Sequence, residues 1–272
     1  MNDRVCVDLA NNVVSLRLAR AEKLNAIDAP LIQGLLDAFE TIRGMSDVRA
    51  VVVSGEGRAF CAGLDTERLR AALAGRDFAH VERSWGAANI YQHLTLLWRA
   101  LPVPVIAAVH GVAFGGGLQL MLGADIRYVR PDTRLSFMEL AWGIVPDMAG
   151  FLFMRDLPRR DLAAELTYTG RVFDGEEALA AGFATRLFDD PHAAALATAR
   201  EIAARNPNAV RAAKRIFSIA DAELQERILR AEVMEQTQLT GSPNQLEAVA
   251  AKLAGRPAAY RPAEERDGGS SP

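Results

Sequence analysis

Two carboxyl groups, Glu139 and Asp147, lie in an apolar stretch that runs from Ser136 to Gly150. Burial among apolar side chains raises the pKa of a carboxyl toward the range that suits proton transfer at neutral pH. Both residues also fit structural roles. Ser136 and Glu139 have the spacing of a capping box, and Asp147 can cap a helix over Met148–Met154. The pattern alone therefore leaves acid–base catalysis and helix capping open for each residue.

Gln119 follows a run of three glycines, where an acidic residue would be a natural proton donor. A carboxamide donates and accepts hydrogen bonds, but it does not exchange protons near neutral pH. If the chemistry needs two ionisable groups, the second must come from another position. We expect Gln119 to position a substrate or a water molecule.

Two glycine-rich turns, Gly57–Asp65 and Gly111–Gly117, each adjoin a strand-like run, Ala50–Ser54 and Val103–Val109. Glycine lets backbone N–H groups approach a ligand closely. Two such turns that converge would form an oxyanion hole for a carbonyl oxygen. A helix predicted from Gly117 to Gly123 would add positive potential at its N-terminus. These features indicate chemistry on an activated acyl group.

Other chemistries have little support. The four histidines lack metal-ligand spacing, no G-x-S-x-G elbow is present, and the glycines lack the dinucleotide spacing, so we expect no metal and no separate cofactor. His110 is expected to be packed or hydrogen-bonded. The aromatic residues Trp85, Tyr91 and Trp98 fit either an acyl pocket or the core, with the core as the default. The basic residues Arg211, Lys214 and Arg215 are predicted to form a solvated helix face.

The elements that must hold these residues follow from periodicity. We predict a hairpin over residues 5–18, a helix over Ala29–Arg43 capped by Asp28, and a strand at Ile126–Val129. The segment Thr66–Leu101 has no strand signal and is expected to be helical. We expect a β/α core over residues 1–190, a helical region over 191–260 with breaks at 206–207 and 241–243, and a frayed tail over 261–272.

The composition bounds the class of protein. The chain has 272 residues, a net charge of −3 and two cysteines. These values disfavour a nucleic-acid partner and a disulfide framework. No apolar run approaches the ~20 residues of a membrane span. We therefore expect a cytoplasmic globular protein without a membrane partner.

Together these residues resemble the crotonase superfamily, the enoyl-CoA hydratase/isomerase family. The resemblance rests on Glu22–Ala26, Phe60–Asp65, the His110–Gly117 run and Gly143–Pro146. It implies an α/β fold, a spiral of ββα units with a C-terminal helical region that mediates trimerisation. It also implies homotrimers or dimers of trimers and an acyl-CoA substrate, with coenzyme A as part of that substrate. By position, the oxyanion hole maps to the N–H groups of Leu64 and Gly116. The CoA-binding positions map to Lys23, Leu24, Ala26, Ala62, Gly63, Asp65 and Gly115.

The resemblance also divides the possible reactions. Hydratases of this family carry one glutamate at the position of Gln119 and one at Glu139, and this chain has only the second. Dienoyl-CoA isomerases pair a glutamate with an aspartate eight residues later, as at Glu139 and Asp147, and usually have an aspartate where Gln119 stands. We therefore expect double-bond isomerisation with Glu139 as the base. The alternatives are a 2-enoyl-CoA hydratase that uses Glu139 alone and an acyl-CoA-binding protein with weak catalysis.

Overall fold

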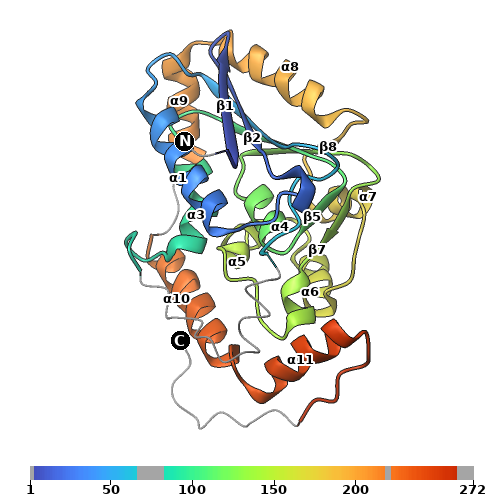
Figure 1. The fold of residues 1–272 in the computed structure, drawn as a ribbon. Coiled ribbons are helices and arrows are strands. Elements are labelled where there is room, and N and C mark those ends of the chain that lie inside the picture. The colour runs from blue at the N-terminus through green and yellow to red at the C-terminus, as the bar shows by residue number, and fades with distance from the viewer. Residues whose placement is uncertain (1–2, 66–82, 218–221, 262–272) are drawn as a thin grey trace.

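The computed structural model describes residues 3–65, 83–217 and 222–261 (Figure 1). It begins with an antiparallel hairpin of β1 (Val5–Ala10) and β2 (Val13–Leu18). Asn11 and Asn12 both have positive φ angles, which a two-residue turn of this hand requires. The predicted hairpin is confirmed.

Parallel strands extend the hairpin into the main sheet. In the described part of the chain its order is β1-β2-β3-β4-β6-β8, with β3 at Ala50–Gly55, β4 at Val105–Val109, β6 at Ile126–Val129 and β8 at Arg186–Leu187. The apolar runs of β3 and β4 are buried, as parallel strands covered on both faces require. A second, two-stranded parallel sheet pairs β5 (Val112–Phe114) with β7 (Arg134–Ser136).

Helices cover and extend these sheets. Asp28 accepts a hydrogen bond from Leu31 N, which confirms it as the N-cap of the first long helix. The described helices, 3-10 turns included, are η1 (Ala21–Lys23), α1 (Ala29–Gly44), α3 (Ile90–Ala100), α4 (Gly116–Leu122), η2 (Met138–Trp142), α5 (Gly150–Met154), α6 (Arg160–Thr169), α7 (Gly175–Ala181), α8 (Pro191–Ala203), α9 (Pro207–Phe217), α10 (Ala222–Leu239) and α11 (Pro243–Ala254). The breaks predicted near residues 206 and 242 are confirmed. Of the predicted helical stretch 66–101, residues 66–82 lie outside the described residues.

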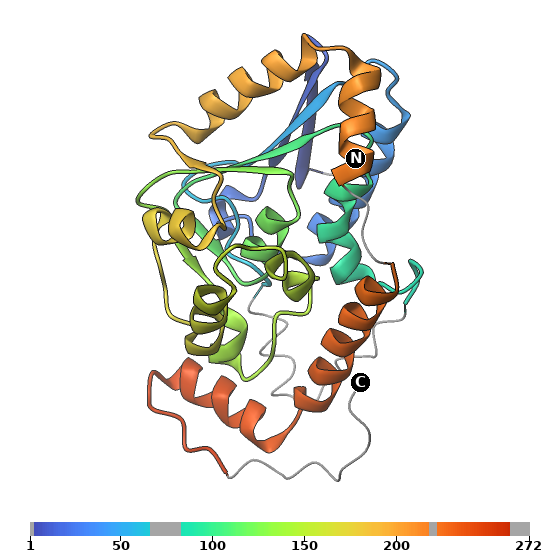
Figure 2. The ribbon, with the colours of Figure 1, turned by 180° about the vertical axis from the view of Figure 1, so that it is seen from behind.

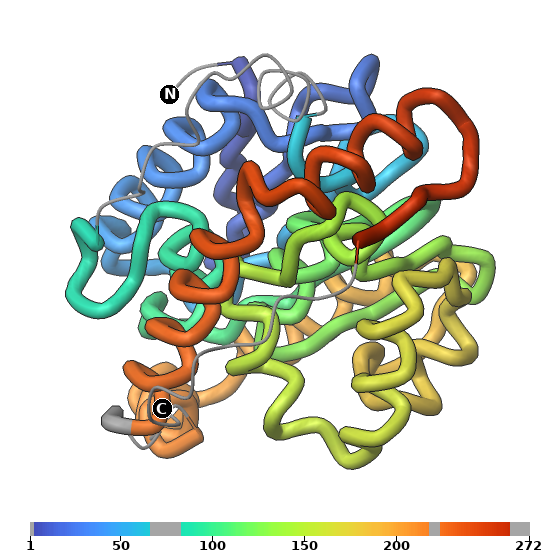
Figure 3. Tube along the Cα trace, turned by 90° about the horizontal axis from the view of Figure 1, so that it is seen from below, coloured from blue at the N-terminus to red at the C-terminus, as the bar shows by residue number. Residues whose placement is uncertain are grey.

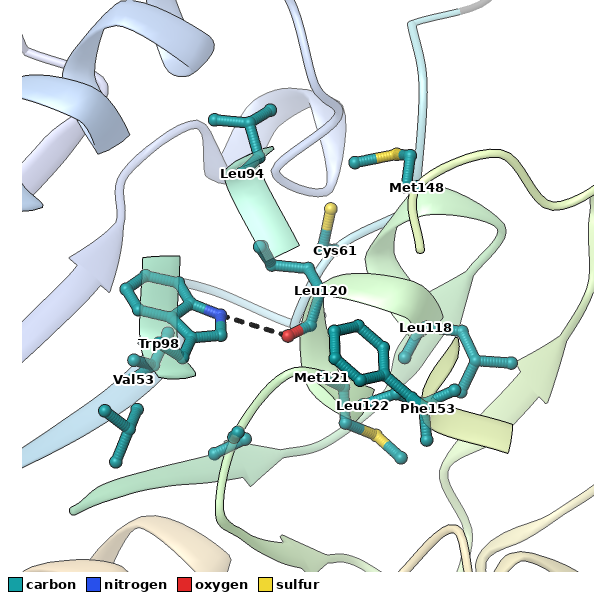
Figure 4. Close-up of a cluster of buried hydrophobic side chains, with 14 of the residues drawn as sticks. Val53, Cys61, Leu94, Trp98, Leu118, Leu120, Met121, Leu122, Met148 and Phe153 are labelled. Atoms are coloured by element: carbon teal, nitrogen blue, oxygen red, sulfur yellow. Dashed lines mark hydrogen bonds between the residues drawn. The ribbon is translucent and has the colours of Figure 1, made fainter. Parts of the chain in front are cut away.

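The two faces of the main sheet have different cover. On one face, α8 packs its alanines Ala195, Ala199 and Ala203 against Val52 and Ile106, and Figure 2 shows this helix crossing the sheet. The other face contacts the main core, which includes residues of α1, α3 and α4. In that core the Trp98 indole donates to Leu120 O at 3.1 Å (Figure 4). Trp98 is therefore a core residue that fixes α4.

The last two helices lie apart from the main sheet. In the view from below, α10 and α11 lie in front of the rest of the chain (Figure 3). There α10 contacts α5, and α11 contacts η2. The predicted division at residue 190 stays a prediction, as does the trimerisation role of residues 191–260. Of the predicted tail, residues 262–272 lie outside the described part. No helix within the described ranges is long and apolar enough to cross a membrane.

Candidate active site

The loop that follows η1 and the turn 61–65 lie side by side. Leu24 and Asn25 both adopt the left-handed conformation. The buried Asn25 side chain donates to Ala59 O at 2.9 Å and accepts from Arg20 N at 2.8 Å. Farther along, Leu24 O accepts from Ala62 N at 2.9 Å. Asn25 thus explains why the sequence places these two loops together.

The predicted CoA-binding residues lie on these loops. Leu24 and Ala26 lie beside Ala62, Gly63 and Asp65, and Ile27 N donates to Gly63 O at 2.8 Å. Lys23 is the exposed last residue of η1. The carboxylate of Asp65 accepts a hydrogen bond from Arg20 at 2.7 Å, with both side chains buried. Asp65 is therefore part of the structure that holds the two loops.

The two glycine-rich turns converge. Gly63 has a φ of +84°, and a Cβ atom there would lie 2.5 Å from Phe114 O and 3.3 Å from the Gly116 nitrogen. Only glycine permits this approach. The chain segments that carry the N–H groups of Leu64 and Gly116 are therefore neighbours, as a two-donor site for a carbonyl oxygen requires.

Glu139 lies at the end of this pair of turns. It is 7% exposed, and its Oε1 accepts from Gln119 Nε2 at 2.6 Å. A Cβ atom on Gly115 would lie 3.2 Å from Glu139 Oε1, so the acid adjoins the turn that leads into α4. Its Oε2 atom is buried and has no hydrogen-bond partner among the described residues. This oxygen is free to take a proton from a bound molecule.

The pKa of Glu139 is raised from 4.5 to about 7: burial and the negative charge of Asp147 raise it, and hydrogen bonds from its own backbone N–H and from Gln119 offset part of the rise. A general base whose pKa lies near neutral pH is well matched to proton transfer. Asp147 is half-buried, and the N–H of the next residue, Met148, donates to Gln119, which donates to Glu139. The structure therefore brings together both predicted acids.

Gln119 is fully buried and connects these groups. Besides donating to Glu139, its Oε1 accepts from Met148 N at 2.9 Å and from Gly150 N at 3.1 Å. Both acceptor sites of the amide oxygen are thereby used. Gln119 thus orients Glu139 and holds the segment that follows Asp147.

The capping interpretations are wrong in the structure. Ser136 Oγ donates to Gly170 O at 2.9 Å, and Glu139 belongs to η2, whose N-cap is Phe137 with no side-chain cap. Helix α5 begins at Gly150, and its N-cap is Ala149 in the left-handed conformation. Neither acid therefore serves as a helix cap.

Three other residues that could carry chemistry are hydrogen-bonded or buried in the structure. His110 Nε2 lies 2.9 Å from Gly57 O, as expected of a hydrogen-bonded histidine. Burial raises the pKa of the Cys61 thiol to about 12, which leaves it without nucleophilic character. Lys214, predicted to be solvated, is buried, so that prediction is wrong.

Sequence reasoning missed one side chain near the site. Glu232 of α10 is 3% exposed and accepts hydrogen bonds from Ala149 N and Phe151 N, in the segment that Gln119 also holds. The sequence holds a weak signal, because Glu232 lies three residues after the apolar Leu229 and therefore on the same face of the helix.

Comparisons with known proteins give the family. The model for enoyl-CoA hydratase/isomerase matches residues 8–254. A mitochondrial Delta(3,5)-Delta(2,4)-dienoyl-CoA isomerase of Mus musculus is 34% identical over 216 residues, covering 75% of this chain and 64% of the relative. The protein named "Probable enoyl-CoA hydratase echA6" of Mycobacterium tuberculosis is 31% identical over 255 residues, covering 93% and 97%. This chain thus spans less than two thirds of the length of the isomerases that it matches.

A solved structure extends the likeness to the fold. The enoyl-CoA hydratase/isomerase of Pseudoalteromonas atlantica T6c superimposes with a TM-score of 0.83 at 28% identity, covering 95% of this chain and 100% of the other. The chain belongs to the enoyl-CoA hydratase/isomerase family and has the crotonase fold. The predicted family and fold class are confirmed, and the comparisons support an enzyme of the crotonase type.

Proposed function

We propose that this chain shifts a carbon–carbon double bond in an acyl-CoA thioester, with Glu139 as the base. The observation that carries the proposal is the carboxyl of Glu139, buried, with a pKa of about 7 and with Oε2 unbonded among the described residues. It adjoins the convergent turns of Gly63 and Gly116. A base beside an oxyanion site is what removal of a proton next to a thioester carbonyl requires.

The steps follow from this arrangement. The thioester oxygen accepts hydrogen bonds from the N–H groups of Leu64 and Gly116. Glu139 Oε2 takes the proton from C2, and the electron pair of the broken C–H bond moves toward the thioester oxygen as an enolate. One oxyanion donor is worth about 3 kcal/mol in such sites. Asp147 or Glu139 then returns a proton to a carbon farther along the conjugated chain, and the double bond has moved.

Gln119 argues against hydration as the main reaction. Its amide oxygen is used by two backbone N–H groups and its Nε2 donates to Glu139, so it supplies no second acid. We assign Gln119 to positioning Glu139 rather than the thioester. A hydratase that uses Glu139 alone remains the alternative that product analysis tests.

The substrate class is proposed on the same grounds. We infer an acyl-CoA ester bound along residues 23–26 and 62–65, with Gly115 at the reacting end and no separate cofactor. A homotrimer or a dimer of trimers is also proposed from the family resemblance, and a cytoplasmic location from the two cysteines, which do not suit a disulfide framework. The exposed Phe217 and Met234 on α9 and α10 agree with an assembly through the C-terminal helices.

The first experiment is mass-resolved product analysis in deuterated water. The purified protein is given a 3-enoyl-CoA, a 3,5-dienoyl-CoA and a 2-enoyl-CoA. A product with a shifted double bond, incorporated deuterium and no added water supports isomerisation. A product that has gained water favours the hydratase, and binding without turnover favours an acyl-CoA-binding protein.

The assignment of Glu139 has its own test. Glu139→Gln keeps an acceptor for Gln119 but removes the base, so we expect turnover to fall by about 10²–10⁴-fold while the Kd for an acyl-CoA stays nearly constant. Glu226→Gln, which changes an exposed glutamate of α10, is the matched control. Full activity of the Glu139→Gln variant would contradict the assignment.

A further inference from the structure

The segment after Asp147, residues 148–151, is held from two sides. On one side, Gln119 Oε1 accepts from Met148 N and Gly150 N. The Thr95 hydroxyl of α3 lies 2.6 Å from Met148 O, as a donor. Gln119 thus links the segment directly to Glu139, to which its Nε2 donates.

On the other side, Glu232 takes the intervening N–H groups. Its Oε2 accepts from Ala149 N at 2.9 Å, and its Oε1 accepts from Phe151 N at 3.1 Å. Four consecutive N–H groups therefore alternate between a carboxamide and a carboxylate. The same helix also reaches Val145, whose N–H donates to Gln236 Oε1 at 3.2 Å.

Glu232 is itself held in place. Gln92 of α3 is fully buried, and its Nε2 donates to Glu232 Oε2 at 3.1 Å and to Leu229 O at 2.9 Å. Three N–H donors therefore surround the carboxylate. Within the described ranges, no lysine or arginine forms an ion pair with Glu232.

Burying a charged carboxyl without a cation lowers the stability of the fold, and an apolar side chain at such a site avoids this loss. Burial raises the pKa of Glu232 to about 8. The hydrogen bonds from Gln92, Ala149 and Phe151 lower this pKa and so favour the ionised form, whose two oxygens only accept. A glutamine here would turn an NH₂ group toward a backbone N–H, so the side chain is chemically matched to the 148–151 segment.

Asp147 directly precedes Met148, whose N–H donates to Gln119, and Gln119 in turn donates to Glu139. The charge of Asp147 raises the pKa of Glu139 and that of Glu232, in keeping with this placement. The hydrogen bonds of Glu232 to Ala149 N and Phe151 N restrict the backbone after Asp147 and so restrict the position of Asp147 itself. An error of about 1 Å in the position of a reacting group can lower a rate by about a hundredfold.

We propose that Glu232 is a positioning residue, which sets the place of the Asp147 carboxyl opposite Glu139 by holding the N–H groups of Ala149 and Phe151. This inference rests on the proposed function and on the route in which Asp147, rather than Glu139, returns the proton. Glu232 does not touch the substrate. It acts on the second half of the reaction and leaves proton removal to Glu139 and the oxyanion site.

The test separates these two halves. In deuterated water, Glu139 alone exchanges the C2 hydrogen of the recovered ester, whereas product forms only after the proton returns at the distant carbon. For Glu232→Gln we expect kcat for product to fall tenfold or more, KM to change less than threefold, and C2 exchange to continue. The ratio of exchange to product therefore rises at least tenfold. A parallel fall of both rates, or no fall, overturns the proposal.

The control is Glu226→Gln, the same substitution at an exposed position on the same helix, which should leave the ratio unchanged. Circular dichroism checks the fold of each variant. If Glu232→Gln does not fold, Glu232→Asp serves instead, because it keeps two acceptor oxygens but shortens their reach. The same rise in the ratio is expected for Glu232→Asp.

Amide hydrogen exchange, resolved by electron-transfer fragmentation, gives a readout that needs no turnover. In Glu232→Gln the amides of Ala149 and Phe151 should exchange faster than in the wild type. The amides of Met148 and Gly150, which Gln119 holds, should keep their wild-type rates. Unchanged exchange overturns the proposal, and so does faster exchange with an unchanged product ratio. A wild-type chain that alters no ester contradicts the proposed function, while amide exchange still decides whether Glu232 holds the segment.

Discussion

The two oxygens of Glu139 have different surroundings, and this difference defines the proposed base. Oε1 accepts from Gln119, which fixes the plane of the carboxyl, and Oε2 is buried without a partner among the described residues. Desolvation raises the pKa of Glu139, and the hydrogen bonds from its own backbone N–H and from Gln119 oppose that rise only in part. The carboxyl is therefore both oriented and basic near neutral pH.

Proton removal should follow the ionisation of Glu139. Because only the carboxylate accepts a proton, C2 exchange is expected to rise with pH up to about 7 and to fall about tenfold per unit below it. Asp147→Asn removes a negative charge that raises the pKa of Glu139, so the midpoint of the profile should move to lower pH. The measurement is C2 deuterium exchange between pH 5.5 and 8.5, with acyl-CoA binding as the control. An unmoved midpoint in the variant would contradict the proximity of the two acids.

At this scale the sequence predicted the acids but not their support. Glu139 and Asp147 stood out because carboxyls are rare in apolar stretches, and Gln119 because it follows three glycines. Glu232 has no such signal, since a glutamate in an amphipathic helix is usually solvated. Glu232 is buried by α3 and by the 148–151 segment. Its partners there are distant in the sequence: Gln92 lies 140 residues earlier and Phe151 lies 81 residues earlier.

Among the elements, α9 shows how one side chain docks a helix. Lys214 is 7% exposed, and its Nζ donates to Trp98 O and Val103 O at 2.8 Å and to Asp125 at 2.7 Å. Asp125 also accepts from Val105 N at the start of β4. The sequence predicted the helix but not these carbonyl partners, which lie in the last turn of α3 and in the loop after it, more than a hundred residues earlier.

Lys214→Met should weaken this docking. The substitution keeps the apolar stem but leaves two carbonyls and one carboxylate without their cation, so we expect unfolding to become easier by about 2–3 kcal/mol. The side chain of Asp125 is 29% exposed, which favours the lower part of that range. Urea denaturation measures the loss, and Arg215→Met, at the exposed neighbour, is the control. Equal stability of the two variants would show that the contacts of Lys214 contribute little.

For the whole molecule, local patterns predicted the hairpin, the strands and most of the described helices, because these have strong periodicity or turn signals, whereas the crotonase-like spiral of ββα units came from the family resemblance. The alternation at residues 5–18 and the apolar runs of β3 and β4 are such signals. The convergence of the two glycine-rich turns was predicted only from their chemistry. It depends on long-range contacts, such as the one between Gly63 and Phe114.

Buried acids also affect the stability of the whole chain. A carboxyl whose pKa is raised on folding, as for Glu139 from 4.5 to about 7, binds its proton more tightly in the folded state. Its contribution to stability is complete below about pH 4.5 and is lost as the pH rises through 7. At about 1.4 kcal/mol per pKa unit, the loss is about 3 kcal/mol.

Glu139→Gln should therefore stabilise the chain more at pH 8 than at pH 5, because glutamine carries no charge to bury and still accepts from Gln119. We expect the free energy of unfolding of the variant, relative to the wild type, to be higher by about 2–3 kcal/mol at the higher pH. Urea denaturation at one fixed protein concentration measures it, since assembly shifts apparent stability. For the control Glu226→Gln, the difference in free energy of unfolding from the wild type should not rise in this way between pH 5 and pH 8. An equal difference at both pH values would mean that Glu139 is already ionised at pH 5, and its assignment as a base active near neutral pH would then fail.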